Sequence, residues 1–317
     1  MSATLAGGTV AVVQVVLAVV AAPLLLGVVR QVRAVLEGRA GAGVLQPWRD
    51  LRKLCAKETL QAAGTTPVQW LAPGAVLVTG VMLAALVPTV ATAGIARLPA
   101  DLFVVVSVLL VGTVALGLLG LDAGTAFGGM GSSRHLTIAA LVEPTVLLAV
   151  YALSVPVGST SLGLIVAGRA ADPSRVVAPA GVLAVVALAV AVIAETARLP
   201  VDNPATHLEL TMVHEAMVLE SSGRDLAALE LGSWLRLSVL LALVANLVLP
   251  WGVAMHVTAG ALALGVVAVV AKTCLLGAVL GAVEVFLAKV RLFRVPDLLT
   301  GSFVLAFLAV TGSFVIG

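Results

Sequence analysis

The chain contains little charge. Asp, Glu, Lys and Arg make up 11% of its 317 residues, and the formal net charge is +2. About a quarter of the residues of a soluble domain are charged, so the composition excludes an ordinary soluble domain. The nearly neutral balance also argues against a nucleic-acid partner. Iron–sulfur ligation needs clustered thiolates, whereas the two cysteines, Cys55 and Cys274, lie far apart. We therefore expect no cluster in this chain.

Long apolar runs fill most of the sequence. The chain is 61% hydrophobic, and its mean hydropathy is +1.18. Runs of about twenty apolar residues match a hydrocarbon core about 30 Å thick, and a spanning segment satisfies its own backbone as a helix. We expect one all-α, polytopic membrane domain without a cleavable signal peptide. Its eight spans are expected near residues 8–29, 68–90, 101–121, 136–157, 176–196, 228–250, 253–275 and 297–316, with a helical stretch at 277–290 continuing from the seventh.

Basic residues gather in alternate loops, which orients the chain. The loops near 30–67, 122–135, 197–227 and 276–296, with their flanks, carry 15 of the 18 Lys and Arg residues. Only Arg97, Arg169 and Arg175 fall on the other side. We therefore expect these four loops to be cytoplasmic, some of them helical, and both termini to lie outside. The expected location is the cell membrane.

The first of these loops contains a basic segment after Pro47 that can form a helix. Asp50 and Lys53 are spaced to interact on one helix face, as are Lys53 and Lys57. One interpretation is an interfacial helix that binds anionic lipid, and the other is a contact surface for a protein partner. The last of these loops, Lys289 to Asp297, has the same two interpretations, docking surface or solvated edge.

A glycine-rich stretch, Phe127–His135, precedes the fourth expected span. Its glycines permit positive φ and close backbone approach, and we expect a loop there. No strand or Gly-Lys-Ser element accompanies it, which argues against a phosphate cradle. Glu143 follows about two turns inside the span, beside Pro144. A carboxylate at that depth is costly, so it predicts a functional group facing protein or water.

The segment 195–225 holds the densest set of ionisable residues. Glu195 and Arg198 are spaced to pair at the end of the fifth span, and Asp202 begins a turn before an expected helix at 205–220. Three polar pairs fall on three different faces of that helix: Glu209 with Glu220, His207 with His214, and Thr211 with Glu215. This pattern predicts a helix enclosed by protein and suits a proton path or polar cavity. The histidine spacing, about 10 Å along a helix, argues against a shared metal ion.

These motifs resemble the membrane component of complex I known as subunit 1. The resemblance covers nearly the whole chain. It is carried by the Leu45–Lys53 pattern with Lys57-Glu58, by the Glu195-Thr-x-Arg-x-Pro-x-Asp202 motif, by Arg134 with Glu143, and by Phe293-Arg-x-x-Asp297. In that family the second motif lies on the quinone side. The resemblance therefore implies a quinone site.

The long segment Pro200–Glu220 is more similar to a sister branch, the subunit 4 type of formate hydrogenlyase and hydrogenase-4 complexes. Here His207 stands where complex I subunits have an acidic residue, and about three residues are added before Glu220. These departures argue against quinone binding. In the hydrogenase branch, electrons from a soluble donor reach protons at a [NiFe] centre in a partner subunit, so both cofactor possibilities stay open.

The resemblance implies a membrane anchor beneath peripheral hydrogenase large and small Fe–S subunits, joined sideways to antiporter-like subunits. Redox chemistry would be coupled to proton or sodium movement, with the Fe–S clusters and [NiFe] centre in the partners and no cofactor or metal bound by this chain. The expected ion path comprises Glu143, Glu195, Glu209, Glu215, Glu220, His207 and His214, supported by Arg198, Asp202 and Arg134. The expected subunit contacts are Gln46, Arg49, Asp50, Lys53, Arg291 and Arg294.

Two alternatives to the hydrogenase-type subunit remain. One is a quinone-site subunit of an NADH-quinone oxidoreductase, within the same superfamily. The other is a stand-alone ion transporter, which inverted repeats with paired broken helices would favour. No such repeat is visible.

Overall fold

A computed structural model describes the chain except residues 1, 63, 93–100, 173, 203–211 and 317. The described residues form no strand, only two isolated bridges. The helices are α1 (Ser2–Leu36), α2 (Gln46–Cys55), α3 (Val68–Leu86), α4 (Leu102–Asp122), α5 (Ala126–Ser154), η2 (Val155–Val157), α6 (Leu162–Ala171), α7 (Ser174–Val177), α8 (Pro179–Glu195), α9 (His214–Val218), α10 (Gly223–Val248), α11 (Ala259–Phe286), η3 (Leu292–Arg294) and α12 (Val295–Ile316). The all-α polytopic prediction is confirmed.

Seven helices of the described part are long and apolar enough to cross a membrane. They are α1, α3, α4, α5, α10, α11 and α12, and each corresponds to an expected span. The eighth, α8, has 17 residues, close to the lower limit for crossing. Pro179 opens α8 at its first turn, which separates it from the short α7. The prediction of about eight spans therefore agrees closely with the structure.

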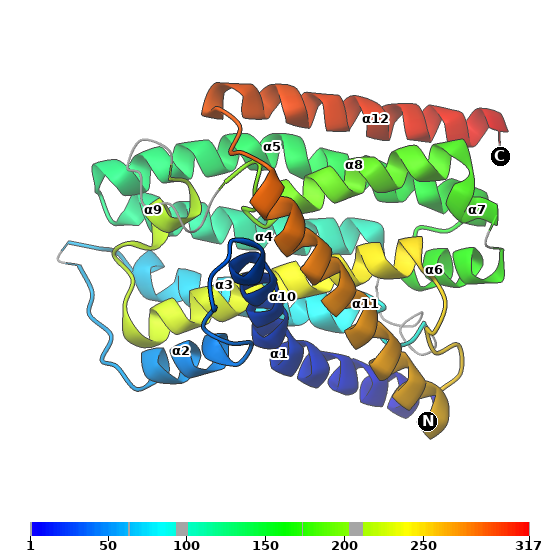
Figure 1. The fold of residues 1–317 in the computed structure, drawn as a ribbon, viewed down its shortest axis with the longest axis horizontal. Coiled ribbons are helices and arrows are strands. Elements are labelled where there is room, and N and C mark those ends of the chain that lie inside the picture. Colours follow the sequence, from blue (N-terminus) through cyan, green and yellow to red (C-terminus); the bar gives the residue numbers. More distant parts are fainter. Residues whose placement is uncertain (1, 63, 93–100, 173, 203–211, 317) are drawn as a thin grey trace.

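The helices run back and forth between two ends of the bundle (Figure 1). At one end lie α2, α9 and the connection from α11 to α12, and at the other lie α6, α7, the start of α1 and the end of α12. Central helix α10 is buried along most of its length and packs against α1, α3 and α11. The largest apolar cluster joins α4, α5, α8, α10 and α12.

The glycine-rich stretch is helical, which corrects the expected loop at 122–135. Thr125 caps α5 by accepting from the amide of Gly128 at 3.1 Å. A Cβ on Gly128 would lie 2.3 Å from the carbonyl oxygen of Gly120, and one on Gly131 would lie 2.9 Å from Cβ of Ala216. These glycines therefore serve close helix packing rather than backbone turns.

Three further boundaries differ from the expectation. Of the expected helix at 205–220, His214–Val218 is helical, while 203–211 lies outside the described residues. The connection after the fourth span contains the unexpected helix α6. Lys272, counted above with the basic flanks, lies in the middle of α11, because that helix is continuous from Ala259 to Phe286. The continuous helix confirms the expected extension of the seventh span.

Candidate functional site

A cavity of about 520 Å³ lies among α1, α3, α4, α5, α9, α10 and α11. The residues 39–42 and the turn after α8 also line it. Charged and imidazole side chains dominate its polar lining: Arg30, Arg33, Arg39, Arg198, Arg236, Glu195, Glu215, Glu230, Glu284, His135 and His214. Helices from both halves of the sequence therefore bring opposite charges to one enclosed place.

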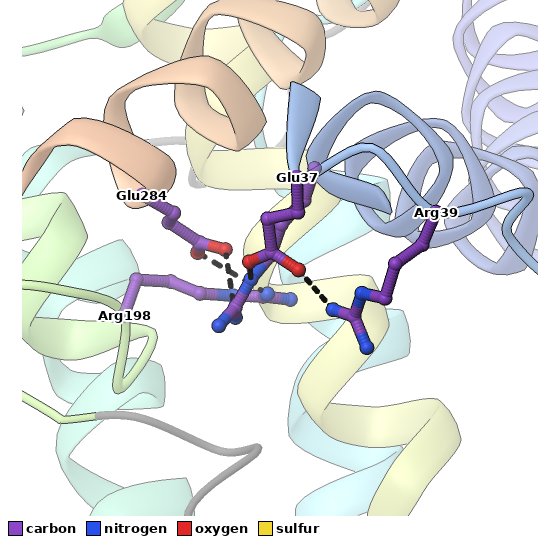
Figure 2. A network of polar contacts seen from close by, with 5 residues as sticks. Glu37, Arg39, Arg198 and Glu284 are labelled. Carbon is purple, nitrogen blue, oxygen red and sulfur yellow. Dashed lines mark hydrogen bonds and ion pairs between the residues drawn. The ribbon is translucent and has the colours of Figure 1, made fainter. Parts of the chain in front are cut away.

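One side of the cavity holds a chain of ion pairs centred on Glu284, which Figure 2 shows from close by. Buried Glu284 lies 3.5 Å from Nη1 of Arg198 and 3.7 Å from Nη1 of Arg33. Arg33 also binds Glu37 at 2.9 Å, and Glu37 pairs with Arg39. The hydrogen bonds from Arg33 and Arg39 hold the pKa of the Glu37 carboxyl below its usual value. Alternating charges thus run from the exposed connection after α1 to the buried end of α11.

Arg198 is the buried cation of this chain of ion pairs. Burial lowers the pKa of its guanidinium from the ordinary value, and the Glu284 carboxylate opposes that shift. An arginine remains protonated in proteins, so Arg198 stays a fixed positive charge. Its position follows from the end of α8, where Ala197 adopts φ of 49° and turns the chain toward the cavity.

A second ion pair lies between α8 and α10. Nη2 of Arg236 is 3.1 Å from Oε1 of Glu195 and donates to Oγ1 of Thr113 at 2.9 Å and to the carbonyl of Leu109. Oε1 of Glu195 lies within ion-pair distance of Arg236, but the two groups are not oriented for a hydrogen bond. Glu143 of α5 is buried and lies within electrostatic range of Glu195 and Arg236. Arg236 therefore pairs with Glu195, and a second buried carboxyl group lies near this pair.

Two histidines adjoin this pair. His135 of α5 lies within electrostatic range of Arg236 and His214, and its Nε2 is buried with no hydrogen-bond partner among the described residues. The amide of His214 donates to Oδ2 of Asp202 at 3.2 Å, and the other oxygen of Asp202 accepts from Lys289 at 2.7 Å. Asp202 thereby joins the start of α9 to the connection between α11 and α12.

The structure brings together part of the expected ion path. Glu195, Glu215, His214 and Arg198 line the cavity, and Glu143 lies beside them. Nη1 of Arg134 donates to the carbonyl of Met212 at 3.1 Å, ahead of α9. Glu220 is exposed after α9 and is not among the cavity-lining residues. His207 and Glu209 lie outside the described residues.

The expected contact residues lie at the same end of the bundle. The expected helix after Pro47 is present as α2, where Nε2 of Gln46 donates to Asp50 at 2.9 Å. Arg49, Lys53, Arg291 and Arg294 are exposed. Together they present positive charge on the surface near the cavity.

The candidate site residues taken from the sequence did not include Arg236, Glu230, Arg33, Arg30 or Glu284. Arg236 falls inside the expected span 228–250, where a cation is as costly as the carboxylate of Glu143. Arg236 is therefore recognisable from the sequence on the same physical ground as Glu143. Glu284 gave no comparable signal, because its partners are about 86 and 251 residues away along the chain.

Known proteins resemble the chain along almost its full length. A family model described as NADH dehydrogenase matches residues 9–314. Formate hydrogenlyase subunit 4 of Escherichia coli (strain K12) is 32% identical over 290 residues, 91% of this chain and 92% of that protein. Hydrogenase-4 component C of the same organism is 30% identical over 299 residues, 94% and 93% of the two chains.

A solved structure also shares the fold. A chain of the membrane-bound sulfane sulfur reductase, an archaeal respiratory membrane complex, superposes with a TM-score of 0.80 at 17% identity. The match covers 99% of this chain and 100% of that chain. The helical arrangement described above is therefore found in a chain of another membrane complex.

Proposed function

The chain belongs to the NADH dehydrogenase family, and from that premise we propose that it anchors and couples a group 4 [NiFe]-hydrogenase-type complex in the membrane. Two relatives at 30–32% identity bear the names of formate hydrogenlyase and hydrogenase-4 components. In this proposal the chain itself performs no redox chemistry. It links electron transfer in a peripheral arm to proton or sodium translocation.

The observation that carries the proposal is the set of paired charges around the cavity. Burying ionised groups is costly unless they are paired, and Arg198, Arg236, Glu195 and Glu284 are paired across four chain segments. In the proposed mechanism, these pairs rearrange when a nearby charge changes. A change of charge in a docked redox subunit can therefore shift protons among the carboxylates of this cavity.

Docking at the α2 end places a partner next to these pairs. The exposed Arg49, Lys53, Arg291 and Arg294 suit an acidic surface on a peripheral subunit. The partners of the proposal are the hydrogenase large and small subunits there and antiporter-like subunits beside the bundle. Iron–sulfur clusters and the [NiFe] centre belong to the partners. The four exposed cations lie on the side that the proposal assigns to the cytoplasm.

The first test is the composition of the complex. We expect mild detergent extraction of the tagged chain to bring down the hydrogenase large and small subunits and antiporter-like subunits, identified by mass spectrometry. The purified complex should evolve hydrogen from reduced methyl viologen. A stable monomer that carries ions without partners would instead support a stand-alone transporter.

The second test separates coupling from hydrogen evolution. Glu195→Gln removes the charge that pairs with Arg236, so ion uptake into vesicles holding the complex should fall about 100-fold while hydrogen evolution persists. Glu58→Gln, which alters an exposed carboxylate at the end of the bundle that carries α2, is the matched control. Equal ion uptake by the wild type and Glu195→Gln would exclude Glu195 from the path.

A quinone-site subunit is the second candidate, favoured by the size of the cavity. The cavity volume of about 520 Å³ lies within the range of small-molecule sites. Nε2 of His135, which has no hydrogen-bond partner among the described residues, could donate a hydrogen bond to a quinone carbonyl oxygen. We expect no quinone reduction by the purified complex. Reduction of a short-chain ubiquinone or menaquinone analogue that is lost in His135→Phe would favour this candidate over the hydrogenase type.

A further inference from the structure

At the end of the bundle opposite α2, two long helices are followed by buried non-helical backbone. Helix α3 ends at Leu86 and α10 at Val248. The segments that follow run beside each other: the amide of Ala254 donates to Val90 and that of Thr92 donates to Ala254, both at 3.0 Å. Backbone that leaves a helix inside a membrane protein must find other partners.

Two neutral side chains supply those partners. Gln14 of α1 donates to the carbonyl of Val87 at 3.3 Å and accepts from the amide of Val90 at 3.1 Å. Asn246 of α10 donates to the carbonyls of Pro88 and Thr89 at 3.0 and 2.8 Å. Both donors of the Asn246 amide group point toward the segment after α3. Its oxygen Oδ1 therefore remains available to a group from another side.

That group is Lys272. Its amine donates to Oδ1 of Asn246 at 3.1 Å and to the carbonyl of Leu249 at 2.6 Å. Lys272 lies near the middle of α11, a 28-residue apolar helix. An ionisable side chain at such a depth is costly and marks a functional group by default.

The acceptors of Lys272 do not fix its charge. Both are neutral oxygens, which accept from an amine and from an ammonium group alike. Lys289 and Arg198, by contrast, each face a carboxylate. None of the ion pairs among the described residues involves Lys272. Lys272 can therefore bind and release a proton without leaving a carboxylate unpaired.

A second cation, Arg169, also reaches the end of α10. Nε of Arg169 donates to the carbonyl of Leu247 at 2.7 Å, and its buried Nη2 has no hydrogen-bond partner in the described structure. The C-terminus of α10 favours a cation, and Arg169 and Lys272 both donate to backbone carbonyls there. Arginine cannot release its proton in a protein. Of the two cations, only Lys272 can exchange a proton.

An apolar barrier separates Lys272 from the charged cavity. Along α10, Asn246 lies ten residues beyond Arg236, about 15 Å. Between them, residues 237–245 are apolar except for Ser238 and are buried. Buried apolar turns of α10 therefore lie between the position of Lys272 and the charged cavity.

We propose that Lys272 is the proton-exchanging group on the far side of the ion path and that the coupled ion is the proton rather than sodium. The inference rests on the proposed function of ion coupling. The ammonium group lies between the C-terminus of α10 and Oδ1 of Asn246, oxygen acceptors of the kind that coordinate sodium in transporters. The protein's own cation therefore takes this position.

The test compares two variants that cannot exchange a proton at this position. Lys272→Arg keeps the charge and the donors, and Lys272→Gln keeps a donor without the charge. The complex carrying each variant is reconstituted in vesicles and driven by hydrogen evolution from reduced methyl viologen. We expect proton uptake per hydrogen evolved, read with a pH-sensitive dye, to fall about 100-fold while subunit composition and hydrogen evolution match the wild type. The neighbouring Thr273→Ser, whose hydroxyl bonds within α11, is the control.

The possible results separate the inference from the function beneath it. Wild-type uptake of protons in either assembled variant would mean that Lys272 only caps α10, and would overturn the inference. Proton movement by the wild-type complex that requires sodium in the buffer would also overturn it, without use of any variant. A wild-type complex that evolves hydrogen but moves no ion would overturn the proposed function itself.

Discussion

At the scale of single residues, Glu284 is a buried carboxylate that pairs with two arginines of the charged cavity. Its side chain is 1% exposed and it faces both Arg33 and Arg198. Removing one partner of a buried pair leaves an uncompensated charge, which costs more than the pair contributes. The stability of the cavity wall therefore depends on this one side chain.

Glu284→Gln should destabilise the protein by about 3–5 kcal/mol, because the buried guanidinium of Arg198 loses its compensating charge, whereas Arg33 keeps Glu37. The apparent melting temperature in detergent, followed by a thiol-reactive dye or by gel filtration after heating, measures the effect. Glu37→Gln is the control: Glu37 joins the same chain of charges from an exposed position, where ion pairs contribute little. Equal melting temperatures for the two variants would contradict the central role of Glu284.

The sequence alone identifies charged residues when the energetic cost of their position is clear from the neighbouring residues in the chain. Glu143 and Glu195 stand at or inside apolar runs, so the expense of a charge in lipid marks them without any knowledge of the fold. Glu284 and Lys272 are different. The role of Glu284 depends on its pairing with Arg33 and Arg198 from distant segments. The role of Lys272 depends on whether α11 continues past it.

At the scale of elements, hydropathy predicts the helices well because lipid demands apolar length and internal backbone hydrogen bonds. It fails at the Phe127–His135 stretch, where glycine has two opposite uses. In a turn it permits positive φ, and in a membrane helix it permits close packing. Only the position of α4 and α9 against α5 decides between them.

Gly128→Ala and Gly129→Ala form a matched pair for this packing. A Cβ at position 128 would meet the carbonyl oxygen of Gly120 at 2.3 Å, whereas one at position 129 meets nothing within 4 Å. We expect Gly128→Ala to destabilise the protein by about 1–3 kcal/mol and Gly129→Ala to leave it unchanged or slightly more stable. Thermal unfolding in detergent compares them. A loop at this stretch would make both substitutions alike.

At the scale of the whole molecule, both termini lie at the same end of the bundle, away from α2 and α9 (Figure 1). If α8 crosses the membrane despite its length of 17 residues, the number of membrane crossings is even, which agrees with both termini lying at one end. Lys272 and Arg236 lie in the middle of α11 and α10, so 13 of the original 15 cations remain at the α2 end in the assignment made from the sequence. The positive-inside rule then predicts that this end faces the cytoplasm.

Reporter fusions test this topology. Alkaline phosphatase, active only outside the cytoplasm, should be active when fused to either terminus, and green fluorescent protein should be dark at both. A membrane-impermeant thiol reagent added to intact cells should fail to label Cys55 of α2, which is exposed. Opposite results at the two termini would show that α8 does not cross.

The pairing of Arg33 and Arg198 with Glu284 also constrains how the protein is made. Synthesis proceeds from the N-terminus, so both arginines leave the ribosome before their carboxylate, which follows Arg198 by 86 residues. A chain that stops short of α11 already contains Glu37, which pairs with Arg33, but it lacks the carboxylate that faces Arg198. Arg198 therefore stays uncompensated until α11 has been made, so the region around the turn after α8 is completed late in synthesis.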